Sequence, residues 1–368
     1  MDDQAAFLAA VGIAGDAGLP TVERPRLAAP AAPGPRTRWL AEVRRARAMA
    51  NAAAVRAAEQ LGPRLAGLPG DHGGPLYPGG GGEVIVESEE FGVPTDARWP
   101  DDGLAAAVAA PIDPVVPHPD AVRDTIAATL FRPAEPHGAL IMVHGGGWWM
   151  GDGRARERLG AEQARAIAAG AGWAVLDIDV RLAPEHPYPL PVFDVLAALD
   201  RVAGRDDLGP RVALLGISSG AHTVAVATLM AAHQGRRVDG QALIVPSLDL
   251  ATLGPANNAD DAAREARWDQ LQGVFGLPTP EQARELVGIS PLASPVLIDP
   301  RLARVAPPTM IATGEYDEAV VGGEAYAAEL AGAGVPVLAG SYVRSHTLST
   351  PAESRRLHTD LARWLNTL

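Results

Sequence analysis

The sequence predicts an α/β fold with a mostly parallel central sheet and helices on both of its faces. From residue 84 onward, apolar runs of strand length alternate with Ala-rich stretches of helical length. Strand and helix alternating at this spacing favour parallel strands joined by helical crossovers. Of the 368 residues 47% are hydrophobic, which is enough to build a large core.

The individual elements follow from local patterns in the sequence. "EVIVESEEF" (83–91) alternates in polarity as a half-exposed strand does, and "TIAATLFRP" (125–133) is a second strand that ends at a proline. The remaining strands are expected at 139–147, 173–181, 211–219, 241–250, 308–317 and 335–343, and the helices between them at 154–171, 189–203, 219–234, 323–333 and 351–367.

Residues 1–82 differ from the rest of the chain. A short Ala-rich segment (3–14) leads through a Pro-rich connector to a longer helical pattern at 37–60. The glycine run "PGGGGE" (78–83) then marks a boundary, and we interpret it as a flexible linker. No "GK[ST]" follows it, so a phosphate-binding loop is not expected there. We therefore predict an amino-terminal helical cap region and linker at 1–82.

Residues 83–368 are predicted to form the main α/β domain, but two stretches break its alternation. They are 94–121, rich in Pro and Asp, and a helical stretch at about 255–290. We expect the second stretch, together with the amino-terminal helices, to lie over the carboxyl edge of the sheet. Active sites of open α/β sheets lie at that edge.

Composition excludes several kinds of chemistry. The chain has no Cys, which excludes disulfides and thiolate sites, and its 31 basic residues are all Arg, which excludes lysine-based chemistry. A formal net charge of −13 argues against nucleic acid and anionic membranes as partners. We find no membrane span and no signal peptide pattern, and we expect a cytoplasmic protein.

The stretch "LLGISSGAHT" (214–223) carries the spacing Gly-x-Ser-x-Gly between a predicted strand and a predicted helix. In a nucleophile elbow the flanking glycines are needed because a Cβ would strike neighbouring backbone in so tight a turn. Only the register Gly216, Ser218, Gly220 satisfies this spacing, so Ser218 is the candidate nucleophile. Taken alone, the motif is also compatible with an ordinary strand–helix turn made of small residues.

A second motif, "MVHGGGWW" (142–149), follows another predicted strand. Acyl transfer places negative charge on a carbonyl oxygen, which preorganised backbone N–H groups stabilise. We assign Gly145 and Gly146 as two such donors and the N–H of Ser219 as a third. His144 is expected to hold the loop by a hydrogen bond rather than to react.

A serine nucleophile needs a histidine base and a carboxylate that orients it, and in this arrangement the chain order is Ser, acid, His. His346 follows the last predicted strand and is the expected base. His222, His233 and His358 lie in predicted helices, and we interpret them as helix-surface residues. Asp317 ends the strand before His346 and is the preferred acid. The competing carboxylates are Asp249, Glu315 and Glu318.

Six short sequence motifs resemble motifs of the hormone-sensitive-lipase-like carboxylesterases of the α/β-hydrolase fold, and they occur in the same order and at similar spacing. The resemblance covers roughly 120–368 and implies Ser218, Asp317 and His346 as a catalytic triad, an oxyanion hole at Gly145, Gly146 and Ser219, and a helical cap. It also implies structural roles for Arg181 and Glu185. The stretches are "HGGGWW", "DVRLAPEHPYP", "GISSGA", "SPLASP", "GEYDEAV" and "SHTL".

The chain departs from the family pattern without losing a proposed catalytic group. The family elbow usually reads Gly-Asp-Ser-Ala-Gly-Gly, whereas Ile217, Ser219 and Ala221 stand here. Val180 replaces a common Tyr, and "DEAV" replaces the usual Asp-Pro-Leu of the acid loop. An isoleucine before the nucleophile makes its surroundings more apolar.

The expected function is hydrolysis of a small-molecule carboxylic ester through an acyl-enzyme, with no metal or organic cofactor. Trp148, Trp149, Trp268 and Phe275 are candidates for an apolar wall that favours small to medium acyl groups or hydrophobic esters. The alternatives are a lactonase, an amidase or an acyltransferase and, from another class, a non-catalytic small-molecule receptor. An exposed last strand could pair two protomers as a homodimer.

Overall fold

The structure is a computed structural model that describes residues 3–16, 24–30, 33–66, 68, 82–96, 122–252 and 261–368. Most of the predicted glycine linker at 78–83 and of the stretch at 94–121 lies outside the described residues. The division at residues 82 and 83 therefore stays a prediction.

Eight strands and the helices between them alternate along the described chain, as the sequence predicts. The strands are β1 (Val84–Gly92), β2 (Thr125–Pro133), β3 (Ala139–Val143), β4 (Ala174–Ile178), β5 (Val212–Ile217), β6 (Gly240–Ile244), β7 (Thr309–Tyr316) and β8 (Val337–Ser345). The helices are α1 (Asp3–Asp16), α2 (Pro33–Leu65), α4 (Arg154–Ala171), α5 (Leu190–Val202), α6 (Ser219–His233), α7 (Asp261–Phe275), α8 (Pro280–Ile289), α9 (Pro300–Ala303), α10 (Val320–Gly332) and α11 (Pro351–Leu365).

The strands form one sheet in the order β1-β2-β4-β3-β5-β6-β7-β8. β2 pairs antiparallel with both β1 and β4, and every other neighbouring pair is parallel. The parallel strands end on the same edge, so the loops after β3, β5, β7 and β8 can meet there.

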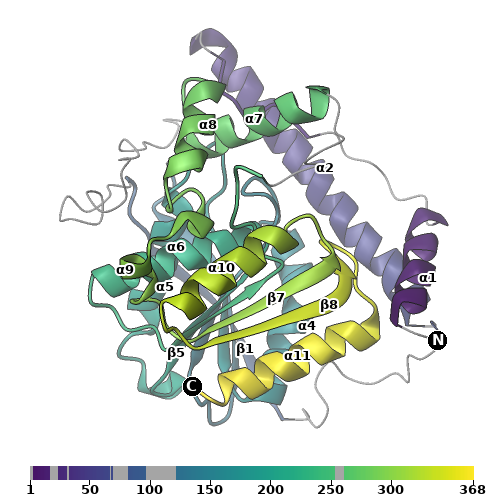
Figure 1. Cartoon of the computed structure of the whole chain (residues 1–368), viewed down its shortest axis with the longest axis vertical. Helices are drawn as coiled ribbons and strands as arrows, with labels where there is room; N and C mark the ends of the chain where they lie inside the picture. Colours follow the sequence, from purple (N-terminus) through teal and green to yellow (C-terminus); the bar gives the residue numbers. More distant parts are fainter. Residues whose placement is uncertain are drawn as a thin grey trace.

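The core lies on both faces of this sheet. Successive residues of β3 alternate between them: Ile141 and Val143 pack with α5, α6 and α10, whereas Leu140 and Met142 pack with α4 and α11. This is the period-two geometry of a strand buried on both sides. Figure 1 shows α10 and α11 on opposite sides of β7 and β8.

Several predicted strands are longer than the observed ones. The run 139–147 leaves the sheet after Val143, because Gly146 and Gly147 take positive φ angles of 126° and 60°. The run 241–250 leaves it after Ile244, where Val245 has a φ of 42°. In both cases the prediction continued the strand past the end of its apolar run, although a glycine run follows in the first case and Pro246 in the second.

The helices α7 and α8 lie together at one end of the molecule, and α2 runs from that end along the side of the molecule to α1 (Figure 1). They contribute residues to the same buried cluster as α5 and α6, including Val43 of α2 and Val274 of α7. No helix in the described part of the chain is long and apolar enough to cross a membrane.

Candidate active site

Ser218 stands at a sharp turn between β5, which ends at Ile217, and α6, which begins at Ser219. Its φ of 55° and ψ of −118° are strained for a non-glycine residue. The turn is held by a 2.9 Å hydrogen bond from the Ser218 N–H to the Ile244 carbonyl oxygen.

The two flanking glycines are required sterically, as the spacing predicts. A Cβ on Gly216 would lie 2.5 Å from the Ala221 Cα, and one on Gly220 would lie 2.9 Å from the Val143 carbonyl carbon. Neither contact is tolerable between backbone atoms that are fixed in the sheet and helix. The sequence Gly216-Ile217-Ser218-Ser219-Gly220 therefore forms an elbow with Ser218 at its apex.

A continuous hydrogen-bonded chain joins three side chains from three loops. Ser218 Oγ lies 2.7 Å from His346 Nε2, and His346 Nδ1 lies 2.9 Å from Asp317 Oδ2. The Asp317 side chain is 3% exposed and also accepts a 3.0 Å hydrogen bond from the Ala319 N–H. A buried carboxylate facing Nδ1 favours the tautomer with a proton on Nδ1. That tautomer leaves the Nε2 lone pair free for the serine hydroxyl.

The competing carboxylates have other surroundings. Asp249 caps its own turn: it accepts hydrogen bonds from the N–H groups of Ala251 and Thr252 and a 2.6 Å bond from the Thr252 hydroxyl. Glu315 and Glu318 are exposed to solvent. Asp317 is thus the carboxylate that the fold brings to His346.

The glycine loop borders the nucleophile. A Cβ on Gly145 would lie 3.2 Å from the Ser218 Cβ, so this backbone runs directly beside the serine. Ser219 occupies the first turn of α6, where N–H groups have no acceptor within the helix. Among the described residues, the N–H groups of Gly145, Gly146 and Ser219 donate no hydrogen bond in the loops around the site. Three backbone donors are therefore available beside Ser218.

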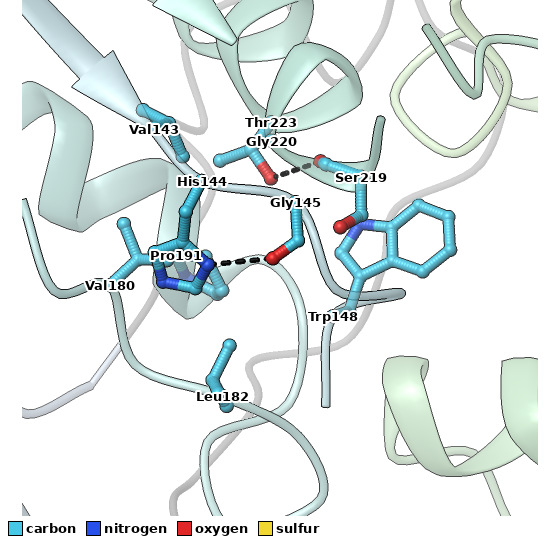
Figure 2. Close-up of a pocket in the computed structure, with 10 residues that line it drawn as sticks. All are labelled: Val143, His144, Gly145, Trp148, Val180, Leu182, Pro191, Ser219, Gly220 and Thr223. Carbon is cyan, nitrogen blue, oxygen red and sulfur yellow. Dashed lines mark hydrogen bonds between the residues drawn. The ribbon is translucent and has the colours of Figure 1, made fainter. Parts of the chain in front are cut away.

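His144 orders this loop, as expected. Its Nδ1–H donates a 2.7 Å hydrogen bond to the Gly145 carbonyl oxygen, and burial lowers the pKa of the imidazole, which keeps it neutral. Figure 2 shows His144, Gly145, Trp148 and Ser219 around a small cavity of about 10 Å³, which is the space of a single water molecule.

A larger cavity, of about 640 Å³, lies between residues 24–27 and the helices α7 and α8. Trp149 and Trp268 line it, together with Gln270. The other two aromatic residues considered for a substrate wall lie elsewhere: Trp148 borders the small cavity, and Phe275 packs edge-on against Tyr188 in the core, with ring centroids 5.2 Å apart.

Two of the histidines predicted to be on helix surfaces are buried instead, and this prediction was wrong for them. His222 has no exposed surface and donates a 2.9 Å hydrogen bond from Nε2 to the Ala293 carbonyl oxygen. Burial lowers its pKa to about 4. His358 is 7% exposed, and its Nδ1 lies 2.6 Å from the Ser354 carbonyl oxygen. His233 is exposed, as expected.

The physical reason for the error at His222 is the composition of α6. Apolar side chains surround that helix on all sides, which is typical of a fully buried helix and not of an amphipathic one. That signal was present in the stretch "AHTVAVATLM".

Arg181 and Glu185 form ion pairs that connect segments of the fold, as the resemblance implies. Arg181 is fully buried, contacts Asp194 at 2.6 Å, and donates hydrogen bonds to the carbonyl oxygens of Pro94 and Arg123. Glu185 pairs with Arg47 of α2 at 2.6 Å. Although burial acts to raise the pKa of Glu185, the Arg47 guanidinium holds it below its usual value. Sequence reasoning missed Arg47, because no local pattern reveals a partner so distant along the chain.

Within the described ranges, no group of three or more His, Asp or Glu side chains is arranged to hold a metal ion.

Comparison with known proteins places this architecture in a family. Residues 140–344, more than half of the chain, match the family described as alpha/beta hydrolase fold. The chain belongs to that family. Its similarity to several esterases confirms the resemblance to the hormone-sensitive-lipase-like carboxylesterases within the fold.

Two curated relatives illustrate this similarity. An arylesterase from Saccharolobus solfataricus is 28% identical over 216 residues, which are 55% of this chain and 65% of that protein. The esterase LipI from Mycobacterium tuberculosis is 35% identical over 213 residues, which are 54% of this chain and 61% of that protein. The matched regions thus span somewhat under two thirds of these relatives.

Among solved structures, an esterase from Pyrobaculum calidifontis aligns with a TM-score of 0.60 at 23% identity. The alignment covers 88% of this chain and 92% of that one. At this level of identity the likeness establishes the α/β-hydrolase fold.

Proposed function

We propose that the chain hydrolyses carboxylic esters with Ser218 as nucleophile, His346 as general base and acid, and Asp317 as the carboxylate that orients His346. The observation that carries this proposal is the hydrogen-bonded chain from Ser218 Oγ through His346 to Asp317, at 2.7 and 2.9 Å, with the serine at a strained elbow. Similarity to esterases supports it.

The reaction follows from these contacts. As Ser218 Oγ bonds to the ester carbonyl carbon, its proton passes to His346 Nε2. The imidazolium next to Asp317 then gives that proton to the leaving alcohol oxygen, and the C–O bond breaks. Water loses a proton to His346 as its oxygen bonds to the acyl carbonyl carbon. The bond from that carbon to Ser218 Oγ then breaks, His346 returns the proton to Ser218 Oγ, and the acid is released.

The negative charge on the carbonyl oxygen is stabilised in both steps by the N–H groups of Gly145, Gly146 and Ser219. We base this assignment on the position of Gly145 beside Ser218 and on the absence of other acceptors for these donors in the described loops. Loss of one such donor typically costs about 3 kcal/mol of transition-state stabilisation, or a hundredfold or more in rate.

We also propose that α2, α7, α8 and residues 24–30 form a cap over the site, and that the cavity lined by Trp149 and Trp268 accepts part of the substrate. A cavity of about 640 Å³ suits a small or medium ester better than a long lipid chain. Competition between short-chain and long-chain p-nitrophenyl esters tests this, and a preference for long chains would contradict it.

A cytoplasmic location and a homodimer paired through the edge strand β8 stay predictions. Cell fractionation tests the first and analytical ultracentrifugation the second.

Turnover of p-nitrophenyl butyrate by the wild type and by Ser218→Ala tests the proposed function. Ser88→Ala, a change at an exposed serine of β1, is the matched control. We expect turnover in the wild type and the control and none above background in Ser218→Ala. Full activity in Ser218→Ala would contradict the assignment. Mass analysis of products with and without an added alcohol separates hydrolysis from acyl transfer.

A further inference from the structure

The loop formed by residues 144–152, which we call the oxyanion loop, has an irregular backbone that includes one strained residue, Trp148. Gly146, Gly147 and Gly151 have positive φ angles, and so does Trp148, at 65°. Its backbone hydrogen bonds within itself are those from the N–H groups of Trp149 and Met150 to the Gly146 carbonyl oxygen, at 3.3 and 3.1 Å. A strained segment persists only where its surroundings hold it in place. Apart from the hydrogen bond of His144 to the Gly145 carbonyl oxygen, the contacts that fix this loop must therefore come from elsewhere in the chain.

Asn51 of α2 holds the end of the oxyanion loop. Its Oδ1 accepts a 2.8 Å hydrogen bond from the Gly151 N–H, and its Nδ2 donates a 2.7 Å hydrogen bond to Asp152 Oδ1. One side-chain amide thus satisfies both a backbone donor and a side-chain acceptor of the loop.

Arg47 lies one turn earlier on the same face of α2, four residues before Asn51. Its Nε donates to the Trp149 carbonyl oxygen at 2.5 Å, and its Nη2 donates to the Ala183 carbonyl oxygen at 2.7 Å. The side chain is 12% exposed, and Glu185 fixes its orientation through the 2.6 Å ion pair. Because the Arg47 guanidinium is planar and held on several sides, it fixes the position of the Trp149 peptide.

Gln270 of α7 contacts the middle of the loop. Its Nε2 donates a 3.1 Å hydrogen bond to the Gly147 carbonyl oxygen, and its Oε1 accepts a 2.8 Å hydrogen bond from Arg24. Three side chains from two helices outside the central α/β layers therefore hold successive points of one short loop.

We propose that Arg47, Asn51 and Gln270 are positioning residues that set the orientation of the Gly145 and Gly146 N–H groups toward the reacting carbonyl oxygen. This inference rests on the proposed function, because it assigns a purpose to the loop in that reaction. It makes α2 and α7 part of the catalytic apparatus in addition to any role in covering the substrate.

The expected effect is on rate and not on substrate affinity. None of the three side chains is placed to touch the reacting atoms, and a displacement of about 1 Å in a catalytic group can cost roughly a hundredfold in rate. We expect Arg47→Ala and Asn51→Ala to lower kcat by roughly 10-fold to 100-fold, with KM changed by less than about threefold. Gln270→Ala should lower kcat somewhat less, and its KM is not used as a criterion because Gln270 also lines the proposed substrate cavity.

The experiment measures kcat and KM for p-nitrophenyl butyrate per active site, with active sites counted by fluorophosphonate titration. It also measures the inhibition constant of a trifluoromethyl ketone, whose tetrahedral adduct places an oxyanion in the same hole. Arg45→Ala is the matched control, because Arg45 is an exposed arginine of α2. The inhibition constant should rise in parallel with the loss of kcat in the three variants and stay within about twofold in the control.

Hydrogen exchange of the peptide that contains residues 144–152 is the second readout, and it does not depend on turnover. We expect faster amide exchange there in Asn51→Ala and Arg47→Ala than in the wild type. Unchanged kcat, inhibition constant and loop exchange in all three variants would overturn the inference. A wild type that exchanges slowly in this loop but turns over no ester would instead contradict the proposed function.

Discussion

The buried imidazole of His222 predicts a specific loss of stability in mild acid. Its Nε2–H donates to the Ala293 carbonyl oxygen, and its Nδ1 has no hydrogen-bond partner among the described residues. The ring packs against Trp148 and Tyr188, with ring centroids 5.3 and 5.2 Å away. Protonation of Nδ1 would place a charge in apolar surroundings, and for this reason burial lowers the pKa from 6.5 to about 4.

The magnitude follows from the difference between the folded and unfolded pKa values. Above about pH 6.5 the imidazole is neutral in both states and contributes no pH dependence. As the pH falls, the unfolded chain takes up a proton that the folded chain does not, so the free energy of unfolding decreases. With pKa values of 6.5 and about 4, the loss is about 2 kcal/mol at pH 5 and approaches about 3 kcal/mol below pH 4.

Urea unfolding at pH 8 and pH 5 of the wild type and of His222→Gln measures this loss. Glutamine keeps a donor for the Ala293 carbonyl oxygen and does not titrate, so the decrease between the two pH values should be about 2 kcal/mol smaller in the variant. Burial also lowers the pKa values of His144 and His358. Because both residues are present in the wild type and in the variant, their contributions to the pH dependence cancel in the comparison. If the free energy of unfolding decreased equally in both proteins between pH 8 and pH 5, the reasoning would be refuted. This holds whatever stability the substitution itself costs at pH 8.

Three further substitutions test the site. Asp317→Asn should lower kcat roughly 10⁴-fold, because it favours the wrong imidazole tautomer of His346. Asp249→Asn, at the competing carboxylate, should leave kcat within about threefold. Steady-state kinetics measures both values, and a large loss in Asp249→Asn with little loss in Asp317→Asn would make Asp249 the acid. Gly146→Ala should lower kcat by at least roughly 100-fold. Gly146 has a φ of 126°, and a Cβ at this position would collide with the Met150 carbonyl oxygen. Circular dichroism should show a folded protein, and an active Gly146→Ala would show that this backbone is not needed in its present conformation.

Much of the candidate site could be predicted from the sequence, because nucleophile elbows and catalytic triads have local sequence patterns. Gly216 and Gly220 locate Ser218 through steric demand alone, and the order of elements leads to Asp317 and His346. The α/β alternation likewise predicts the sheet, since the apolar runs that form β3, β4, β5 and β6 had to be buried on both faces.

What the sequence did not reveal depends on contacts between distant segments. Arg47 and Asn51 look like ordinary polar residues of an Ala-rich helix, and only the packing of α2 against the oxyanion loop gives them a partner. Burial of His222 depends on α6 being covered on all sides, which a search for charged or catalytic residues overlooks. Both errors come from judging a helix residue by its type rather than by the neighbours of its helix.

Labelling with a fluorophosphonate, followed by intact-mass analysis and peptide mapping, tests the central claim most directly. The account predicts a single adduct on Ser218 in the folded wild type, no adduct in Ser218→Ala, and much slower labelling in Asp317→Asn. A folded chain that never labels would contradict the claim and favour a non-catalytic receptor, and an adduct on another residue would contradict the assignment of the nucleophile.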